Sequence, residues 1–245
     1  MLLKVKFKEF GKKVYIINIT KNIHANSIIA WQSELCNSIQ NEFKNIIEDV
    51  VFSLSEITLF FKEIPDDNDK RLIRLWVRGF SLRKQTIKRN FWEIPACFDP
   101  IYSEDLMNYF QKNSLACNTY ISDFLKCIFQ VHHYGFLPGF FYSTGLPTKL
   151  NLPRKASPSK LVEPGTLAIG ESYVGIYPQK SPGGWHRIGK TYYSFFNRLN
   201  NPPCFALPGD KIKFTSINLN EYQKQNDKIY DTKKLPNSTS FEIIC

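Results

Sequence analysis

The most informative part of this sequence is residues 135–191, which contain Gly135-Phe-Leu-Pro-Gly-Phe-Phe-Tyr142, Pro153-Arg-Lys-Ala-Ser-Pro158, Gly175-Ile-Tyr-Pro178 and Ser181-Pro-Gly-Gly-Trp-His-Arg-Ile-Gly-Lys-Thr191. Proline fixes the backbone angle φ, whereas glycine admits left-handed turns and close backbone approach. The aromatic residues between them supply buried anchors. Such rigid loops often form the ligand-bearing face of a small β scaffold, although tight barrel corners would have the same composition.

Short β-type segments alternate with Gly and Pro around these loops, at 166–169, 173–177 and 211–217. Short strands with frequent turn signals predict a small closed or sandwiched β structure. Corner loops on one rim of a closed β scaffold converge, so we expect the loops at 135–142, 153–158 and 181–191 to lie together at one end of the barrel. Two helical patterns precede it, at 103–111 and 119–126. The tail after Tyr222 is polar, so we expect it to be poorly held, with 240–245 able to rejoin a sheet edge.

The first hundred residues have a different pattern, in which helices and strands alternate. Strand patterns occur at 14–19, 46–53, 56–61 and 91–97, and helical patterns at 27–43 and 69–86. Asn26 or Ser27 would cap the first helix. This β-α-β-β-α-β order is that of a ferredoxin-like unit. The sequence therefore predicts an α+β protein with a ferredoxin-like lobe at 1–98 and a β-barrel lobe at 99–245 that ends in a polar tail.

The net charge of +10 raises the question of nucleic-acid binding. Residues 70–92 hold eight Lys and Arg and no Asp or Glu. A solvated helix explains such a run better than an anion-binding face does, because charge runs are usually solvated. No RNP, KH, zinc-finger or helix-turn-helix pattern accompanies it, so we expect no specific nucleic-acid site.

The six cysteines form no C-x-x-C pair and have no zinc-type spacing with the four histidines. We therefore expect reduced thiols and no metal. The sequence also has no signal-peptide pattern and no run of about 18 apolar residues, so we expect a cytoplasmic protein that does not engage a membrane.

One nucleotide-binding pattern occurs in the chain. Gly184-Trp-His-Arg-Ile-Gly-Lys-Thr191 fits G-x-x-x-x-G-K-[ST]. A phosphate-binding loop follows a buried strand and opens a helix. Here a turn, Gln179-Lys-Ser-Pro-Gly, precedes the pattern and the aromatic Tyr192-Tyr-Ser-Phe-Phe follows it. We interpret the match as a chance occurrence of the pattern and expect no nucleotide site.

The same loops carry a resemblance to a known family. In order and spacing, Gly-Phe-x-Pro-Gly-Phe-x-Tyr, Pro-Arg-x-x-x-Pro, Gly-Ile-Tyr-Pro and Ser-Pro-Gly-Gly-Trp-x-x-Ile-Gly-x-Thr resemble the family of the 5-oxoprolinase B subunit (PxpB), KipI and allophanate hydrolase subunit 1. The likeness covers roughly residues 90–222. The chain departs from the family pattern at Ser143-Thr144, Tyr173-Val174 and Phe124, and these losses of polar groups bear on catalysis and not on the fold.

The resemblance implies a ferredoxin-like lobe followed by a cyclophilin-like β-barrel. It implies a non-autonomous subunit, inactive alone, of an ATP-dependent complex that opens 5-oxoproline to glutamate. The partners would be a KipA-like C subunit, with the active site at its interface, and a LamB/YcsF-like A subunit. The assembled complex would use ATP, and this chain would bind no cofactor. The alternative is a regulatory module that inhibits a sensor histidine kinase.

The site expected from these motifs binds substrate or partner through Phe136, Pro138, Gly139, Tyr142, Arg154, Gly183, Gly184, Trp185 and His186. Arg154 is the best anion-binding candidate, because its planar fork suits a carboxylate, although structural pairing at the surface explains it almost as well. His186 is an acid–base candidate or simply an exposed side chain. Arg154 and His186 are thus weak catalytic candidates, and no serine triad is visible. His132 and His133 alternate along a strand, so one should face inward and one outward.

Overall fold

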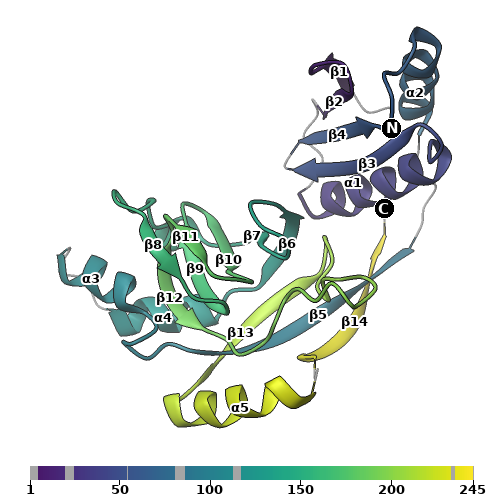
Figure 1. Ribbon diagram of the computed structural model, residues 1–245. Helices are drawn as coiled ribbons and strands as arrows, with labels where there is room; N and C mark the ends of the chain where they lie inside the picture. The colour runs from purple at the N-terminus through teal and green to yellow at the C-terminus, as the bar shows by residue number, and fades with distance from the viewer. Residues whose placement is uncertain are drawn as a thin grey trace. The chain divides into compact units, whose positions relative to one another are not determined.

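The computed structural model describes residues 5–19, 25–53, 55–80, 86–112, 117–232 and 235–244 (Figure 1). The chain divides into two compact units: Met1–Lys88 with Glu242–Cys245, and Arg89–Phe241. The α+β class predicted from the sequence is confirmed, since both units combine sheets with a few helices.

The first unit is a four-stranded antiparallel sheet with helices packed against it. Its strands are β1 (Val5–Glu9), β2 (Val14–Ile19), β3 (Ile47–Ser53) and β4 (Glu56–Phe61), in the order β1-β2-β4-β3. Alternate residues of β2 and β4 are buried, as the two-residue period of a strand requires. These residues form one core with apolar residues of α1 (Ala25–Glu42) and α2 (Asp67–Gly79).

The start of α2 is fixed by local chemistry. Asp66 accepts a hydrogen bond from the backbone N–H of Asp69, and the Asp69 carboxylate accepts one from the backbone N–H of Asp66. This capping box satisfies two of the N–H groups that the first turn leaves unpaired. The helix therefore begins two residues before the predicted 69, and it ends at Gly79; residues 81–85 of the predicted helix lie outside the described part of the chain.

The sequence prediction was wrong about the last strand of the ferredoxin-like order. That strand, β5 (Thr86–Cys97), pairs with strands of the second sheet and not with β2. The edge beside β2 is taken by β1, which returns through a tight turn containing Gly11 at a φ of 68°. Trp92 and Ile94 of β5 instead join the core of the second unit, which explains where the strand belongs.

The second unit contains an eight-stranded sheet that closes on itself. Its order is β12-β9-β10-β7-β6-β13-β5-β14, and Lys190 of β12 also pairs with Cys97 of β5. Its remaining strands are β6 (Phe129–Tyr134), β7 (Phe141–Thr144), β9 (Thr166–Gly170), β10 (Tyr173–Ile176), β12 (His186–Lys190), β13 (Lys211–Ile217) and β14 (Asn237–Ile244). The strands predicted near 166, 173 and 211 are thus confirmed.

The remaining elements of this unit surround that sheet. They are α3 (Glu104–Lys112), α4 (Cys117–Leu125), a 3₁₀ turn at Thr148–Leu150, and a two-stranded sheet of β8 (Ser159–Val162) and β11 (Ser181–Gly183). Apolar residues of α3 and α4 join the main core, among them Leu106, Phe110 and Phe124. Both predicted short helices are therefore confirmed.

The polar tail predicted after Tyr222 is a helix instead, α5 (Leu219–Thr232). Asn218 and Glu221 form a reciprocal capping pair, with Glu221 N–H to Asn218 Oδ1 at 2.9 Å and Asn218 N–H to Glu221 Oε2 at 3.0 Å. The Glu, Gln and Lys residues that follow are good helix formers despite their polarity. After the helix, β14 pairs with β5, so the expected return to a sheet edge is confirmed.

Membrane-spanning helices and metal-binding clusters are both absent from the described residues. No helix there is both long enough and apolar enough to cross a membrane. Within the same ranges, no group of three or more His, Cys, Asp or Glu residues is arranged to hold a metal ion.

Candidate functional site

The three motif segments expected at one end of the barrel line one pocket. Its volume is about 250 Å³, and its walls are Phe136, Phe140, Tyr142, Arg154, Pro158, Tyr177, Pro182, Gly183, Gly184 and Trp185. These residues come from 135–142, 153–158 and 181–191, with Tyr177 added from the 175–178 motif just after β10. The loops therefore converge as predicted, although they are far apart along the chain.

The pocket wall is aromatic. Phe140 lies at its centre, with ring centroids 5.1 Å from Tyr177, 5.2 Å from Tyr142 and 5.3 Å from Trp185, all in edge-to-face geometry. Phe140, Tyr177 and Trp185 also belong to a small apolar cluster separate from the main core. Edge-to-face contacts of this kind hold each ring in place, so the wall is preorganised.

Phe136 forms an exposed lip of the pocket in a strained backbone conformation. Its φ is +68°, and the N–H of Leu137 donates to the carbonyl of Gly135 at 2.8 Å, which closes a γ-turn around Phe136. A left-handed φ is costly for an aromatic residue and persists only where the surroundings enforce it. The ring nevertheless remains 59% exposed, so the strained turn presents apolar surface at the pocket entrance.

Arg154 is the charged residue among the described side chains that line the pocket. Its Nε lies 3.4 Å from Oε1 of Glu171, and both side chains are exposed, at 66% and 61%. Glu171 is therefore the surface partner that the structural-pairing interpretation of Arg154 requires. Most of the Arg154 side chain nevertheless remains accessible, as the ligand-binding interpretation requires.

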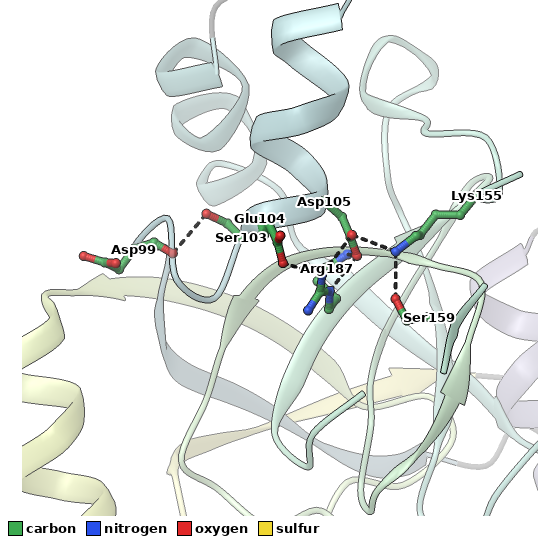
Figure 2. Close-up of polar contacts among 7 residues, drawn as sticks. All are labelled: Asp99, Ser103, Glu104, Asp105, Lys155, Ser159 and Arg187. Carbon is green, nitrogen blue, oxygen red and sulfur yellow. Dashed lines mark hydrogen bonds and ion pairs between the residues drawn. The ribbon is translucent and has the colours of Figure 1, made fainter. Parts of the chain in front are cut away.

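A buried polar network holds the Arg154 loop against the barrel (Figure 2). Asp105 of α3 accepts hydrogen bonds from Nζ of Lys155 at 2.7 Å and from Nε of Arg187 at 2.6 Å. Lys155 Nζ also donates to Oγ of Ser159 at 2.7 Å, while its backbone N–H donates to the carbonyl of Gly184 at 2.8 Å. Lys155 thus ties one pocket loop both to α3 and to a second pocket loop.

The other end of this network fixes α3. Arg187 donates a further hydrogen bond to Oε2 of Glu104 at 2.9 Å. Just before the helix begins, Ser103 donates its hydroxyl to the carbonyl oxygen of Asp99 at 3.0 Å (Figure 2). The same hydroxyl also lies 3.1 Å from the carbonyl oxygen of Phe98. The first turn of α3 is therefore held by the bonds of Arg187, and the loop that leads into it by the bonds of Ser103.

The titratable groups at the site have shifted pKa values with clear causes. Burial alone would raise the pKa of Asp105, but the hydrogen bonds from Arg187 and Lys155 outweigh it and lower the pKa to about 2. Burial raises the pKa of Tyr177 to about 12. Burial also raises the pKa of Tyr142, an effect that the positive charge of Arg154 opposes. At neutral pH the pocket therefore presents protonated phenols and one cation.

Six predicted site residues line the pocket and three do not. The lining residues are Phe136, Tyr142, Arg154, Gly183, Gly184 and Trp185. Pro138 is exposed on the turn outside the pocket, and Gly139 is buried against Phe196, whose Cβ would lie 2.3 Å from an added Cβ. His186 is buried, with its ring 5.2 Å from that of Tyr109 on α3, so its position corrects the expectation of an exposed loop residue.

His186 is poorly placed for acid–base chemistry at this pocket. Its Nδ1 is buried without a hydrogen-bond partner among the described residues, and burial lowers its pKa. The prediction that His132 and His133 face opposite ways was also wrong. Both are buried, and their Nδ1 atoms lie 3.1 Å apart, because an irregularity in the β6–β7 register at this point breaks the strict alternation.

Sequence reasoning missed four pocket residues and the network behind them. Phe140, Pro158, Tyr177 and Pro182 all lie within the quoted motifs, so the motifs themselves were the available signal. The Asp105–Arg187 contact joins residues 82 positions apart, and no local pattern indicates it.

Two other expectations have structural outcomes. The G-x-x-x-x-G-K-[ST] pattern lies largely on the strand β12 and opens no helix, a context unlike that of a phosphate-binding loop. That this chain has no nucleotide site stays a prediction. Three of the five residues that depart from the family pattern are buried: Phe124 and Val174 are core residues, and Ser143 Oγ donates to the carbonyl of Val174 at 2.8 Å. The other two, Thr144 and Tyr173, are half-buried.

The basic helix α2 is partly neutralised within its own unit. Lys70 Nζ lies 3.1 Å from Oε2 of Glu9, and Arg74 lies within 3.9 Å of the same carboxylate and also donates to Tyr15. Arg71 donates to Oδ1 of Asn68 at 3.0 Å. These contacts favour the solvated-helix interpretation of the charge run, while nucleic-acid binding itself stays a prediction.

Comparison with known proteins gives a consistent result. Residues 5–206 match the family model described as carboxyltransferase domain, subdomain C and D. The Haemophilus influenzae protein named as the B subunit of 5-oxoprolinase is 32% identical over 178 residues, which are 72% of this chain and 81% of that protein. The Escherichia coli O157:H7 protein of the same name is 30% identical over 176 residues, 71% of this chain and 79% of its own length.

Solved structures share the fold at lower identity. The crystal structure of TTHA0988 has a TM-score of 0.69 and 23% identity, covering 84% of this chain but only 40% of its own. The Kluyveromyces lactis urea amidolyase has a TM-score of 0.77 and 13% identity, covering 99% of this chain and 16% of its own. This chain thus spans well under half the length of either protein.

Proposed function

This chain belongs to the family of 5-oxoprolinase B subunits and carries its carboxyltransferase subdomains C and D, and we propose that it is a non-autonomous subunit of an ATP-dependent amidohydrolase complex. In this proposal the complex opens 5-oxoproline to glutamate in the cytoplasm. ATP phosphorylates the lactam carbonyl, and water then cleaves the activated amide. A KipA-like protein and a LamB/YcsF-like protein are the other two subunits. The assembled complex uses ATP, and this chain binds no cofactor.

The chemistry of the pocket carries the proposal. Among the described residues that line it, none is a His, Cys, Ser, Lys, Asp or Glu that could act as base or nucleophile. The phenols of Tyr142 and Tyr177 have raised pKa values, so they stay protonated at neutral pH and offer no phenolate to act as a base. Such a pocket can bind and orient a ligand through Arg154 and its aromatic walls, but the reacting groups must come from elsewhere.

The proposal places the interface with the KipA-like protein at the pocket rim. Phe136 and Arg154 are both well exposed there, and aromatic residues and Arg are enriched at interface hot spots. The proposal also retains a cyclophilin-like barrel for the second unit, which is supported by the closure of its sheet through Lys190 and Cys97.

Association with a purified KipA-like protein tests this proposal. Arg154→Ala should weaken the measured affinity by about 1–3 kcal/mol, the range for a charge-assisted hydrogen bond. Lys149→Ala is the control, because Lys149 has a similar exposure of 67% but does not line the pocket. Equal affinities for the two variants would contradict the proposed interface. Binding to a sensor histidine kinase and not to the KipA-like protein would indicate a regulatory module instead.

A further inference from the structure

The ion pair between Arg154 and Glu171 places an internal carboxylate beside the pocket. Nε of Arg154 and Oε1 of Glu171 are 3.4 Å apart, and both side chains are more than half exposed. Exposed pairs of this kind contribute little to stability, because water screens them and long side chains lose freedom in forming them. The pair is therefore easily broken, and stability alone does not explain its position.

The backbone holds Glu171 in this position. Glu171 lies between β9 and β10 at a φ of +59°, a left-handed conformation that costs energy for a residue other than glycine. Its N–H donates to the carbonyl of Leu152 at 2.6 Å, and the N–H of Leu152 donates back to the carbonyl of Glu171 at 3.3 Å. Leu152 is two residues before Arg154, so this bridge fixes the Glu171 backbone beside the start of the arginine loop.

The pocket itself fits a small ligand with one negative charge. Its volume of about 250 Å³ lies just below the range of roughly 300–1,000 Å³ typical of sites for drug-sized molecules. Its walls are aromatic rings and prolines, and Arg154 supplies the one charge among its described lining residues. A compact apolar ring that carries a carboxylate matches both features, since the guanidinium fork suits a carboxylate.

We propose that Glu171 is a built-in competitor at this site, which pairs with Arg154 in the empty pocket and is displaced by the carboxylate of a ligand. This inference rests on the proposed function only in taking the pocket as the ligand site. The competitor lowers the affinity for anionic ligands, which must displace Glu171 from Arg154, so that a bound anionic product can leave. A neutral ligand does not compete for the Arg154 guanidinium, so Glu171 leaves its affinity unchanged.

Isothermal titration of the full chain tests the proposal, with cyclopentanecarboxylate as the probe and cyclopentanecarboxamide as its neutral analogue. Glu171→Gln should tighten binding of the carboxylate by about two- to fivefold, the effect of removing an exposed ion pair, and should not tighten binding of the amide. Glu163→Gln is the matched control, because Glu163 pairs with Lys180 at the same 3.4 Å in a similarly exposed position. This control should leave both affinities unchanged.

Repeating Glu171→Gln in an Arg154→Gln protein shows whether Glu171 changes ligand affinity through Arg154. Arg154→Gln should weaken binding of the carboxylate about tenfold, the scale of a charge-assisted hydrogen bond, and adding Glu171→Gln to it should change nothing further. Equal tightening in both backgrounds would mean that Glu171 acts through its general field, and this result would overturn the proposal. Failure of the carboxylate to bind any variant, or equal binding of the amide, would also overturn it.

These outcomes are separate from those of the proposed function. The titration uses this chain alone and measures neither partner association nor turnover. Tighter binding by Glu171→Gln together with no affinity for the KipA-like protein would preserve the competitor and reject the proposed complex. The reverse combination would reject the competitor alone.

Discussion

Asp105 and Arg187 are linked by three hydrogen bonds in the second unit. The Asp105 carboxylate accepts from the Arg187 backbone N–H at 3.1 Å, from Nε at 2.6 Å and from Nη2 at 3.0 Å. The carboxylate is 9% exposed, so these bonds replace its lost hydration. Because Lys155 also donates to Asp105, one buried charge connects α3, β12 and the Arg154 loop.

Replacing Asp105 should therefore destabilise the protein measurably. Asp105→Asn removes the negative charge and leaves the positive charges of Arg187 and Lys155 poorly compensated in a partly buried site. Breaking a buried pair in this way costs about 3–5 kcal/mol. Chemical denaturation followed by circular dichroism measures the loss. Glu104→Gln is the control, because Glu104 is 63% exposed and its pair with Arg187 should contribute at most about 1 kcal/mol.

The low pKa of Asp105 also predicts a loss of stability in acid. The folded-state pKa of about 2 is below the unfolded value near 4, so the contribution of this group is fully present above about pH 4. It is lost as the pH falls through about 2, and the full effect is roughly 2 kcal/mol. The melting temperature of the Asp105→Asn variant should fall less steeply over this range than that of the natural protein. Parallel curves would show that another group dominates the acid response.

Protonation of His133 should cause a second loss of stability, in a higher pH range than that of Asp105. Burial lowers its pKa to about 4, aided by the neighbouring His132, so the folded protein resists its protonation. Stability should decline as the pH falls from about 6.5 toward 4, because the unfolded chain gains the proton first. His133→Phe keeps a ring that can stack on Tyr142 and should reduce the slope of melting temperature against pH in this window. An unchanged slope would assign the window to other groups.

Two adjacent glycines of the pocket should respond differently to alanine. A Cβ added at Gly183 would lie 2.2 Å from the hydroxyl oxygen of Tyr177, whereas one at Gly184 meets only Pro158 at 3.9 Å. Gly183→Ala should therefore displace Tyr177 from the pocket wall and lower the free energy of unfolding by about 1–3 kcal/mol, the typical cost of overpacking. It should also weaken binding of the KipA-like protein. Gly184→Ala should bind normally. Equal affinities of the two variants for the KipA-like protein would show that the position of Tyr177 does not matter for binding.

How far the sequence predicts this structure depends on the range of each interaction. Convergence of the motif loops follows from the motifs, because rim loops of a closed β scaffold meet at one end. The expectation of a poorly held tail after Tyr222 is wrong because Asn218 and Glu221 form a capping pair that fixes the start of α5. That capping signal was the local chemistry from which the helix could have been predicted.

Other features depend on contacts that no local pattern contains. Strand β5 has the expected period, but its partner β13 begins more than a hundred residues later, at Lys211. In the sequence, Asp105 is an ordinary acidic residue of the first turn of α3, where a negative charge interacts favourably with the helix dipole. Only the fold brings it to Arg187 and Lys155. The position of His186 is likewise set by packing against Tyr109, and its motif gives no sign of that burial.

The central claim is that this chain contributes a binding surface and not a complete active site. The most direct measurement is hydrolysis of ATP that depends on 5-oxoproline, assayed with the purified chain alone and after mixing with the KipA-like and LamB/YcsF-like proteins. The account predicts no ATP hydrolysis and no glutamate from the chain alone, no effect of Lys190→Ala on that background, and formation of glutamate only when all three proteins are present. Robust ATP hydrolysis by the chain alone that Lys190→Ala abolishes would contradict it, as would full activity of the two partner proteins without this chain.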